Sequence, residues 1–319
     1  MPRNRRKKGI LDKGLKLTHL RLVNALDRTG GMQAAADYLS IAQPAASRLA
    51  AEIDQILGQK IHQRLGKGIE LTAAGHALAK RAARILQEIE DVEQEILEIG
   101  HGLTGSVRIG SVTGPAIEYI LPVLKEARLT MPKVTISVEI STSDILADRL
   151  ANGELDFVLG RLPSAHPPEL FDEIPIAAEP VSFIARTDHA LVMLKKVSVE
   201  QMLTFNWVLP FKGTILLNTI EQALRQRGHS LPTQTFTTSS FLLTLALVRQ
   251  TNAIAPIATS VAVEFSGTSR DMEPLGIINS DLNVSVEMFS LLKLAARVFS
   301  PATKAVYDAT LNSVKPEYV

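Results

Sequence analysis

Apolar residues near the start of the chain recur at helical spacing and then stop at a pair of glycines. A first helix is predicted by five of them: Leu17, Leu20, Leu22, Val23 and Leu26. It ends near Gly30-Gly31, and the alanine-rich run 32–39 predicts a short second helix. After a turn at 40–42, a third helix is predicted from Gln43-Pro44 to Ile56, because proline is tolerated in a first helical turn. Three short helices in this order are typical of a helix-turn-helix.

The third helix has two faces of different chemistry. Ala46, Leu49, Ala50 and Ile53 form an apolar face, whereas Gln43, Ser47 and Arg48 lie away from it near the helix N-terminus. Glutamine can pair with adenine, arginine with guanine, and serine with a base or a phosphate. Taken alone, these three could equally be residues of a solvated face.

Residues 63–72 follow with two short extended stretches around Gly66-Lys67-Gly68, which predicts a β-hairpin wing. Its cations, Arg64 and Lys67, are placed to meet a nucleic-acid backbone.

A strict heptad pattern comes next. Its apolar positions are spaced alternately four and three residues apart: Leu78, Ala82, Ile85, Ile89, Val92, Ile96 and Ile99. A single amphipathic helix lying on its own domain would also show such a stripe, but the stripe is narrow and flanked by charges. The pattern favours a helix that pairs with a second copy of the chain. Glycines at 100, 102 and 105 then predict a hinge.

From residue 106 onward strands alternate with helices, which predicts an α/β fold with an open sheet and two lobes. The predicted strands are 106–112, 134–140, 156–161, 181–186, 207–210, 233–238 and 253–257. The predicted helices are 114–130, 143–152, 215–227 and 239–249. Chain crossings between the lobes are expected near 161–180 and 274–283.

Small polar residues follow the ends of several predicted strands. Open α/β sheets bind ligands at the carboxyl ends of their strands, so these residues are candidates for a small-molecule site. The candidates are Ser111, Thr113, Gly114, Ser141, Thr142, Ser143, Arg161, Lys212, Thr214 and Ser239. Each hydroxyl alone is more often an ordinary helix N-cap. Together, with Arg161 and Lys212 as cations, they would suit a small polar or anionic ligand.

Charge is distributed unevenly along the chain. Residues 1–86 hold 16 Lys and Arg against 6 Asp and Glu, and the rest of the chain holds 18 against 27. Together with the helix-turn-helix, this balance favours DNA as the partner of the N-terminal part. There is no cysteine and no apolar run of membrane-spanning length, and no apolar segment follows the basic N-terminus to make a signal peptide. We therefore expect a cytoplasmic protein.

The N-terminal motifs resemble those of the LysR-type transcriptional regulators. The run 30–48, from Gly-Gly-Met through Gln-Pro-Ala-Ala-Ser-Arg, is similar to the family signature, and Leu71-Thr72-Ala73-Ala74-Gly75 matches downstream. The resemblance implies that Gln43, Pro44, Ser47 and Arg48 enter the major groove, with Lys67 and Thr72 near phosphates. It also implies dimerisation through the long helix. The chain departs from the signature at Gly31, Ala34 and Ala42, which removes any DNA contacts that side chains there would make.

Residues 105–300 resemble the type 2 periplasmic-binding-like effector domain of the same family, with landmarks such as Val107-Arg108-Ile109-Gly110 and Leu121-Pro122-Val123-Leu124. By position, the resemblance implies that Thr113, Thr142 and Arg161 line an effector cleft. The amino-acid sequences of 109–115 and 159–163 are most similar to those of the galactose-binding-protein regulator subgroup. That similarity points to a sugar, sugar acid or aromatic acid as the effector.

The domain organisation expected from these observations has four parts. They are a disordered basic tail at 1–16, a winged helix-turn-helix at 17–75, a linker helix at 76–100 and an effector domain at 101–319. Lobe I is expected to cover 105–175 and 281–310, and lobe II 176–280.

Two other classes of protein fit the sequence less well. A solute-binding protein would not need the DNA-reading motif. An enzyme would need a catalytic set, and the sequence holds no P-loop, Gly-x-Ser-x-Gly or dinucleotide motif. The histidines at 19, 62, 76, 101, 166, 189 and 229 show no metal-ligand spacing. We therefore expect a homo-oligomeric regulator that binds double-stranded DNA and a small effector, with no enzymatic activity, cofactor or membrane contact.

Overall fold

The computed structural model describes residues 9–65, 68–101, 103–267 and 273–314. Backbone contacts divide the chain into two compact units. The first contains residues up to 104, with the short segments 151–154 and 299–301, and the second contains the rest of the chain from 105 onward.

The first unit has three short helices, a two-stranded sheet and one long helix. They are α1 (Leu17–Thr29), α2 (Met32–Tyr38), α3 (Gln43–Leu57), β1 (His62–Leu65), β2 (Gly68–Leu71) and α4 (Ala73–His101). Gly30, with a φ of 68°, ends α1 in the left-handed conformation that glycine adopts without strain. The predicted order of three helices, wing and long helix is present.

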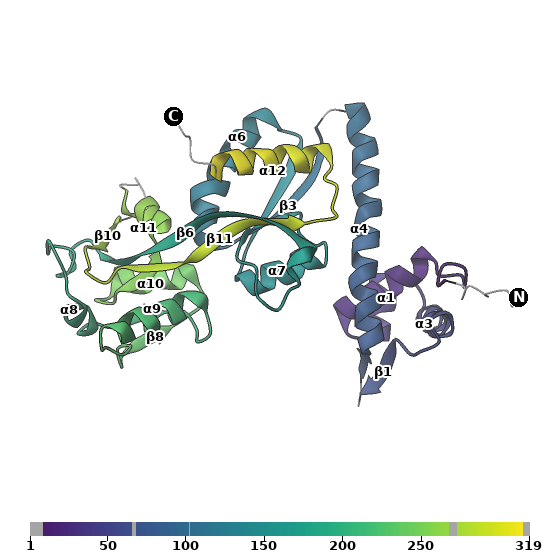
Figure 1. Ribbon diagram of the computed structural model, residues 1–319, viewed down its shortest axis with the longest axis horizontal. Coiled ribbons are helices and arrows are strands. Elements are labelled where there is room, and N and C mark those ends of the chain that lie inside the picture. The colour runs from purple at the N-terminus through teal and green to yellow at the C-terminus, as the bar shows by residue number, and fades with distance from the viewer. Residues whose placement is uncertain (1–8, 66–67, 102, 268–272, 315–319) are drawn as a thin grey trace, which may run out of the picture. The chain divides into compact units, whose positions relative to one another are not determined.

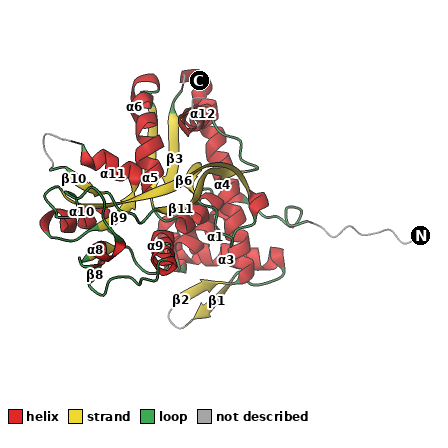
Figure 2. Cartoon of the chain, turned by 60° about the vertical axis from the view of Figure 1, so that its left-hand side comes forward, coloured by secondary structure: helices red, strands yellow, loops and turns green. Residues whose placement is uncertain are grey.

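A single apolar core joins these elements. Its buried residues come from α1, α2, α3 and the start of α4, including Leu22, Val23, Ala35, Ile53 and Ala82. The alanines of α2 let neighbouring helices approach closely, as the sequence indicates. Figure 2 shows the wing strands β1 and β2 beside these helices.

The start of α4 lies against the chain that leads into the wing. A Cβ built on Gly75 would be 2.0 Å from the carbonyl oxygen of Ile61, so only glycine fits here. Further along α4, the heptad residues Ile85, Ile89, Val92 and Ile96 are exposed, whereas Ala82 is buried in the core. Within this chain, the predicted heptad stripe is therefore buried at its N-terminal end and exposed from Ile85 onward as far as Ile96.

Residues 9–15 differ from the expected disordered tail. Lys13 donates a backbone hydrogen bond to Gly9, Leu15 donates one to Ile10, and Leu15 packs on the core of the first unit. The ammonium group of Lys13 also donates to the carbonyl oxygen of Ile56, at 3.2 Å. Leu15 thus attaches this segment to the core and Lys13 attaches it to α3, while residues 1–8 of the expected tail lie outside the described residues.

The second unit is built on a mixed sheet. Its strands are β3 (Gly105–Ser111), β4 (Val134–Ile140), β5 (Phe157–Gly160), β6 (Phe171–Arg186), β7 (Trp207–Leu209), β8 (Thr235–Thr237), β9 (Ala255–Ala258), β10 (Leu275–Ile278) and β11 (Val284–Leu294). The main sheet has the order β10-β6-β11-β5-β3-β4, and β9 also pairs with β6. Strands β7 and β8 are parallel, and a bridge between Trp207 and Ile254 joins β7 to the start of β9.

Two long strands connect the two ends of this sheet. β6 and β11 pair antiparallel from Val284 opposite Val181 to Leu294 opposite Phe171, and Figure 1 shows them running side by side. We call the part with β3, β4 and β5 lobe I, and the part with β7 to β10 lobe II. The second connection between the lobes is β11 itself, at residues 284–294. The crossing expected at 274–283 was therefore placed too early in the chain. β6 also begins ten residues before the predicted 181, because Pro175 and Pro180 hide the strand pattern.

Helices cover both lobes. In lobe I they are α5 (Thr113–Pro115), the π-helical turn η1 (Ala116–Ile120), α6 (Leu121–Thr130), α7 (Ser143–Ala151), the 3₁₀ turn η2 (Pro168–Leu170) and α12 (Pro301–Val314). In lobe II they are α8 (Val199–Leu203), α9 (Ile215–Gln226), α10 (Phe241–Gln250) and α11 (Thr259–Ser266). The helix predicted at 114–130 is thus interrupted by a π-helical turn that begins at Ala116, directly after Pro115. Such turns recur at functional sites.

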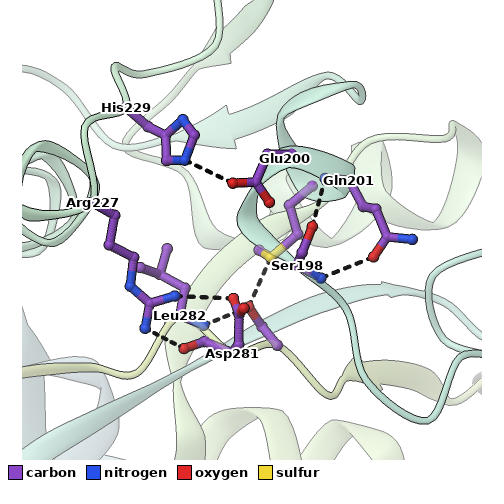
Figure 3. Close-up of polar contacts among 9 residues, drawn as sticks. Ser198, Glu200, Gln201, Arg227, His229, Asp281 and Leu282 are labelled. Atoms are coloured by element: carbon purple, nitrogen blue, oxygen red, sulfur yellow. Dashed lines mark hydrogen bonds and ion pairs between the residues drawn. The ribbon is translucent and has the colours of Figure 1, made fainter.

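Polar contacts hold the outer part of lobe II together, as Figure 3 shows. Arg227, which follows α9, donates to the carboxylate of Asp281 at 3.0 Å, and His229 pairs with Glu200 on α8 at 3.0 Å. The indole nitrogen of the buried Trp207 donates to Met202. These contacts connect α8, α9 and the segment before β11, so His229 has a structural partner here.

Candidate functional sites

The N-terminus of α3 presents four polar or small residues to solvent. Gln43, Pro44, Ser47 and Arg48 are all exposed, while Ala46, Ala50 and Ile53 on the opposite face are buried. Pro44 lies in the first turn, where its missing N–H breaks no helical hydrogen bond. The sequence therefore predicted correctly which face of α3 is buried and which is exposed.

Two of these side chains are already ordered by one another. The amide nitrogen of Gln43 donates to the hydroxyl oxygen of Ser47 at 3.1 Å, one turn further along the helix. Arg48 makes no hydrogen bond or ion pair within the described part of the chain. A pre-oriented amide beside an unpaired guanidinium is able to form the two-point hydrogen bonds that distinguish adenine and guanine in the major groove.

A buried histidine attaches α3 to α1. The Nδ1 atom of His19 accepts from the backbone N–H of Lys16, so its Nε2–H donates to Glu52 at 3.0 Å. This hydrogen bond, with smaller effects from the charges of His19, Arg48 and Lys16, lowers the pKa of Glu52 below its ordinary value of 4.5. The contact orients α3 from its middle and leaves its N-terminus open.

The three candidate DNA-contacting residues in and after the wing differ in their surroundings. Arg64 lies in β1 opposite Ile69, and Lys67 lies outside the described residues. The hydroxyl of Thr72 donates to the carbonyl of Lys60 at 2.8 Å and accepts from the N–H of Gly75 at 3.2 Å. Thr72 is thus the N-cap of α4, and its hydroxyl is used within the chain.

In lobe I the ends of three parallel strands meet at one edge. β3 pairs with β4 on one side and β5 on the other, so Ser111, Ile140 and Leu159 lie in register. Ser141 donates its N–H to the carbonyl of Ser111 at 3.3 Å, and Arg161 donates its N–H to the hydroxyl of Ser143 at 3.1 Å.

The candidate residues at this edge divide into two groups. Ser111 and Ser143 are buried, and their hydroxyls are bonded within the chain. The hydroxyl of Ser111 donates to the carbonyl of Val112, and the hydroxyl of Ser143 accepts from the N–H of Arg161. Thr113, Gly114, Ser141, Thr142 and Arg161 lie around them at the same edge. Thr142 hydrogen-bonds Asp144 at the start of α7, which lowers the pKa of that carboxyl.

In lobe II the candidates follow β7 and β8. The N–H of Thr238 donates to the carbonyl of Leu209, so the ends of these parallel strands are adjacent. Thr214 caps α9 and donates to the carbonyl of Phe211 at 2.9 Å. Lys212 and Ser239 are exposed. The cap of α10 is Ser240, which accepts from Leu243, so here the residue next to the predicted Ser239 takes the capping position.

Three further residues that the sequence analysis missed, Thr259, Ser260 and Glu179, lie near the lobe I edge, and Ser260 joins the two lobes directly. Ser260, at the start of α11, donates its hydroxyl to the carbonyl of Gly114 at 3.4 Å. Its neighbour Thr259 hydrogen-bonds Ser182 of β6 at 2.9 Å. Thr259 and Ser260 directly follow β9, so the rule that selected hydroxyl residues at strand ends would have found them.

The third missed residue is Glu179 of β6. Its Oε2 accepts from Nη2 of Arg161 at 2.8 Å. No sequence signal marks it, because it lies within a strand between Ala178 and Pro180 and pairs with its arginine only through the fold. We call the group formed by Thr113, Gly114, Arg161, Glu179 and Ser260 the strand-end site.

Neither a metal centre nor a membrane span is found among the described residues. No group of three or more histidine, aspartate or glutamate side chains could hold a metal ion there. No helix in the same ranges is long and apolar enough to cross a membrane.

Comparison with known proteins matches both units. Residues 17–76 match the model of the bacterial regulatory helix-turn-helix proteins of the lysR family, and residues 100–309 match the LysR substrate binding domain. The transcriptional regulator GbpR of Rhizobium radiobacter is 36% identical over 258 residues, which cover 80% of this chain and 85% of that protein. GbpR of Azospirillum brasilense is 31% identical over 296 residues, covering 92% and 85%.

A solved structure has the same fold. Full-length CbnR in complex with its target DNA superposes with a TM-score of 0.63 at 20% identity, over 94% of this chain and all of that one. The fold class expected from the sequence is thereby confirmed, and the relatives are regulators, as expected, and not enzymes. The chain belongs to the LysR family: it is a DNA-binding transcriptional regulator with a second domain for small-molecule effectors.

Proposed function

We propose that this regulator reads its operator with the N-terminus of α3. The observation that carries the proposal is the exposed group of Gln43, Ser47 and Arg48 on a helix whose other face is buried. Gln43 and Ser47 support one another, and Arg48 has no hydrogen bond or ion pair within the described residues to break before it binds a base. The excess of cations in residues 1–86 supplies the attraction to phosphate that any DNA site shares.

The experiment uses the duplex that the full-length wild-type protein enriches from a random-sequence pool. Arg48→Ala is expected to lower affinity for that duplex about 5- to 150-fold in a mobility-shift titration, as for loss of one base-reading arginine. Arg21→Ala is the matched control, since Arg21 is an exposed arginine on α1. Equal losses for the two variants, or an unchanged preference over a scrambled duplex in Arg48→Ala, would refute the assignment.

Self-association through α4 is the second part of the proposal. Ile85, Ile89, Val92 and Ile96 form an exposed apolar stripe along one side of the helix, with charged residues beside it. A second copy of the same stripe would cover it, and the dimer would carry two α3 helices for two half-sites. Association of dimers into a tetramer would extend the footprint to a second pair of half-sites.

The effector is proposed to bind at the strand-end site, where hydroxyl residues from both lobes and the Arg161–Glu179 pair lie together. It is a small polar molecule of the class of a sugar, sugar acid or aromatic acid. Because the hydrogen bond from Ser260 to Gly114 joins the two lobes here, a ligand at this place would bias how the lobes close. Because the chain matches a family of bacterial DNA-binding regulators, we also propose that it acts in the cytoplasm.

A further inference from the structure

The guanidinium of Arg161 is partnered by the chain itself. Its Nη2 donates to Oε2 of Glu179 at 2.8 Å, and its Nε donates to the backbone carbonyl of Glu287 at 2.8 Å. Both side chains are largely buried, Arg161 with 11% and Glu179 with 14% of its surface exposed. An ion pair this sheltered from water is screened little, so Glu179 neutralises Arg161 effectively.

Glu179 reaches this position because a glycine leaves room for it. A Cβ added to Gly114 would lie 2.1 Å from Oε1 of Glu179, so any side chain at this position would displace the carboxylate. Gly114 is also the residue whose carbonyl accepts from Ser260. The carboxylate therefore lies at the junction of the lobes, beside the arginine that an anionic ligand would otherwise approach.

The pair still offers hydrogen bonds to a ligand. Within the described residues, Nη1 of Arg161 and Oε1 of Glu179 have no hydrogen-bond partner, and neither belongs to the buried unpartnered atoms of the chain. One is a donor and the other an acceptor. A hydroxyl group can accept from the first and donate to the second, whereas a carboxylate or phosphate would have its negative charge directly beside that of Glu179.

We propose that Glu179 is the specificity-determining residue of the strand-end site: it occupies the anion position beside Arg161, so the site selects uncharged, hydroxyl-bearing effectors over carboxylates and phosphates. This inference rests on the proposed effector site and narrows its ligand class. It excludes sugar acids and aromatic acids from the position beside Arg161.

The test asks whether removal of Glu179 creates an anion site. Thermal unfolding of the full-length protein is followed while acetate replaces chloride at constant ionic strength. In Glu179→Ala, Arg161 loses its counter-ion, and acetate is expected to fill the vacated position. At an acetate concentration about tenfold above its dissociation constant, the unfolding midpoint of the effector unit should rise by about 3 °C relative to chloride.

Three controls define the site. The wild type should show no difference between acetate and chloride, and the double variant Arg161→Ala/Glu179→Ala should lose the response. Glu287→Ala removes a nearby exposed carboxylate but keeps the backbone carbonyl that Arg161 contacts, so it should behave as the wild type does.

A wild-type protein that is stabilised by acetate as strongly as Glu179→Ala would overturn the proposal, since Arg161 would then be open to anions. So would a response in Glu287→Ala equal to that in Glu179→Ala, or no response in Glu179→Ala. If Glu179→Ala does not fold, Glu179→Gln takes its place, because it keeps the size of the side chain and removes the charge. These measurements involve no DNA, so their failure is separate from a failure of operator binding by the α3 variants.

Discussion

The N-terminus of α3 and the strand-end site are built from similar residue types but use them in opposite ways. On α3, Ser47 and Arg48 point to solvent, and Arg48 is unpaired within the described chain. At the strand-end site Arg161 is largely buried, its N–H donates to the buried neighbour Ser143, and its guanidinium pairs with Glu179. In the proposed function, the first surface binds DNA, a large and rigid partner, whereas the second offers a small ligand a position whose positive charge Glu179 neutralises.

The two units also differ in whether the chain itself covers the surface in question. The first unit has an apolar stripe on α4 that is exposed within this chain, and in the proposed dimer a second copy covers it. The second unit closes its own strand-end site, with hydrogen bonds between its lobes. Changes in the two units should therefore have separable consequences, beginning with association.

The largest effect is expected from a charge in the α4 stripe. Ile89→Glu places a carboxylate where two helices would pack, and the protein should become monomeric by sedimentation equilibrium. Because the two half-sites would then be bound independently, operator affinity should fall by about 100-fold or more. Glu90→Ala, an exposed position of α4 on the side away from the stripe, should leave both measurements unchanged. A fully dimeric Ile89→Glu protein would contradict the proposed interface.

Two glycine substitutions should separate the stabilities of the units. Gly75→Ala forces a Cβ against the backbone carbonyl of Ile61, at 2.0 Å, and should destabilise the DNA-binding unit by about 3 kcal/mol or more. Gly110→Ala meets the methyl groups of Leu155, Leu146 and Val158 at 2.7–2.9 Å, and these can move a little, so a loss of about 1–2 kcal/mol is expected in the effector unit.

Thermal unfolding followed separately in each unit measures both effects. The tryptophan at 207 reports on the effector unit, and loss of DNA binding reports on the other. If Gly75→Ala shifted the Trp207 signal as much as Gly110→Ala does, the units would not unfold independently.

The smallest expected effect is a difference in pH dependence. Burial lowers the pKa of His189 in lobe II below its ordinary value of 6.5, so the folded unit disfavours the charged form. Its contribution to stability is complete above pH 6.5 and is lost as the pH falls through the lowered pKa. For Glu52 in the first unit, the contribution is complete above pH 4.5 and is lost as the pH falls below that value.

The effector unit should thus begin to weaken at a higher pH than the DNA-binding unit. Urea unfolding between pH 7 and pH 4 measures this difference. His189→Gln should remove the part of the decline that begins near pH 6.5 in the effector unit and leave the other unit unchanged. A decline that persists unaltered in this variant would assign it to other groups.

Most of the first unit could be predicted from the sequence alone. The glycine pair, the small alanines and the polar face of α3 are local signals, because a helix shows its buried side in the spacing of its own residues. The exposure of Gln43, Ser47 and Arg48 followed from the same spacing. Strand ends with hydroxyl residues also predicted most of the lobe I edge, since parallel strands end at one side of a sheet.

The tertiary structure alone decided the rest. The first part of β6, which contains Pro175 and Pro180, and the whole of β11 were not predicted. Their antiparallel register is what joins the lobes. The role of Thr72 as the cap of α4 depends on the carbonyl of Lys60, and the partner of Arg161 is a glutamate 18 residues away on another strand. Sequence spacing records what lies on one face of one element, whereas a charge pair between elements exists only once the sheet has formed.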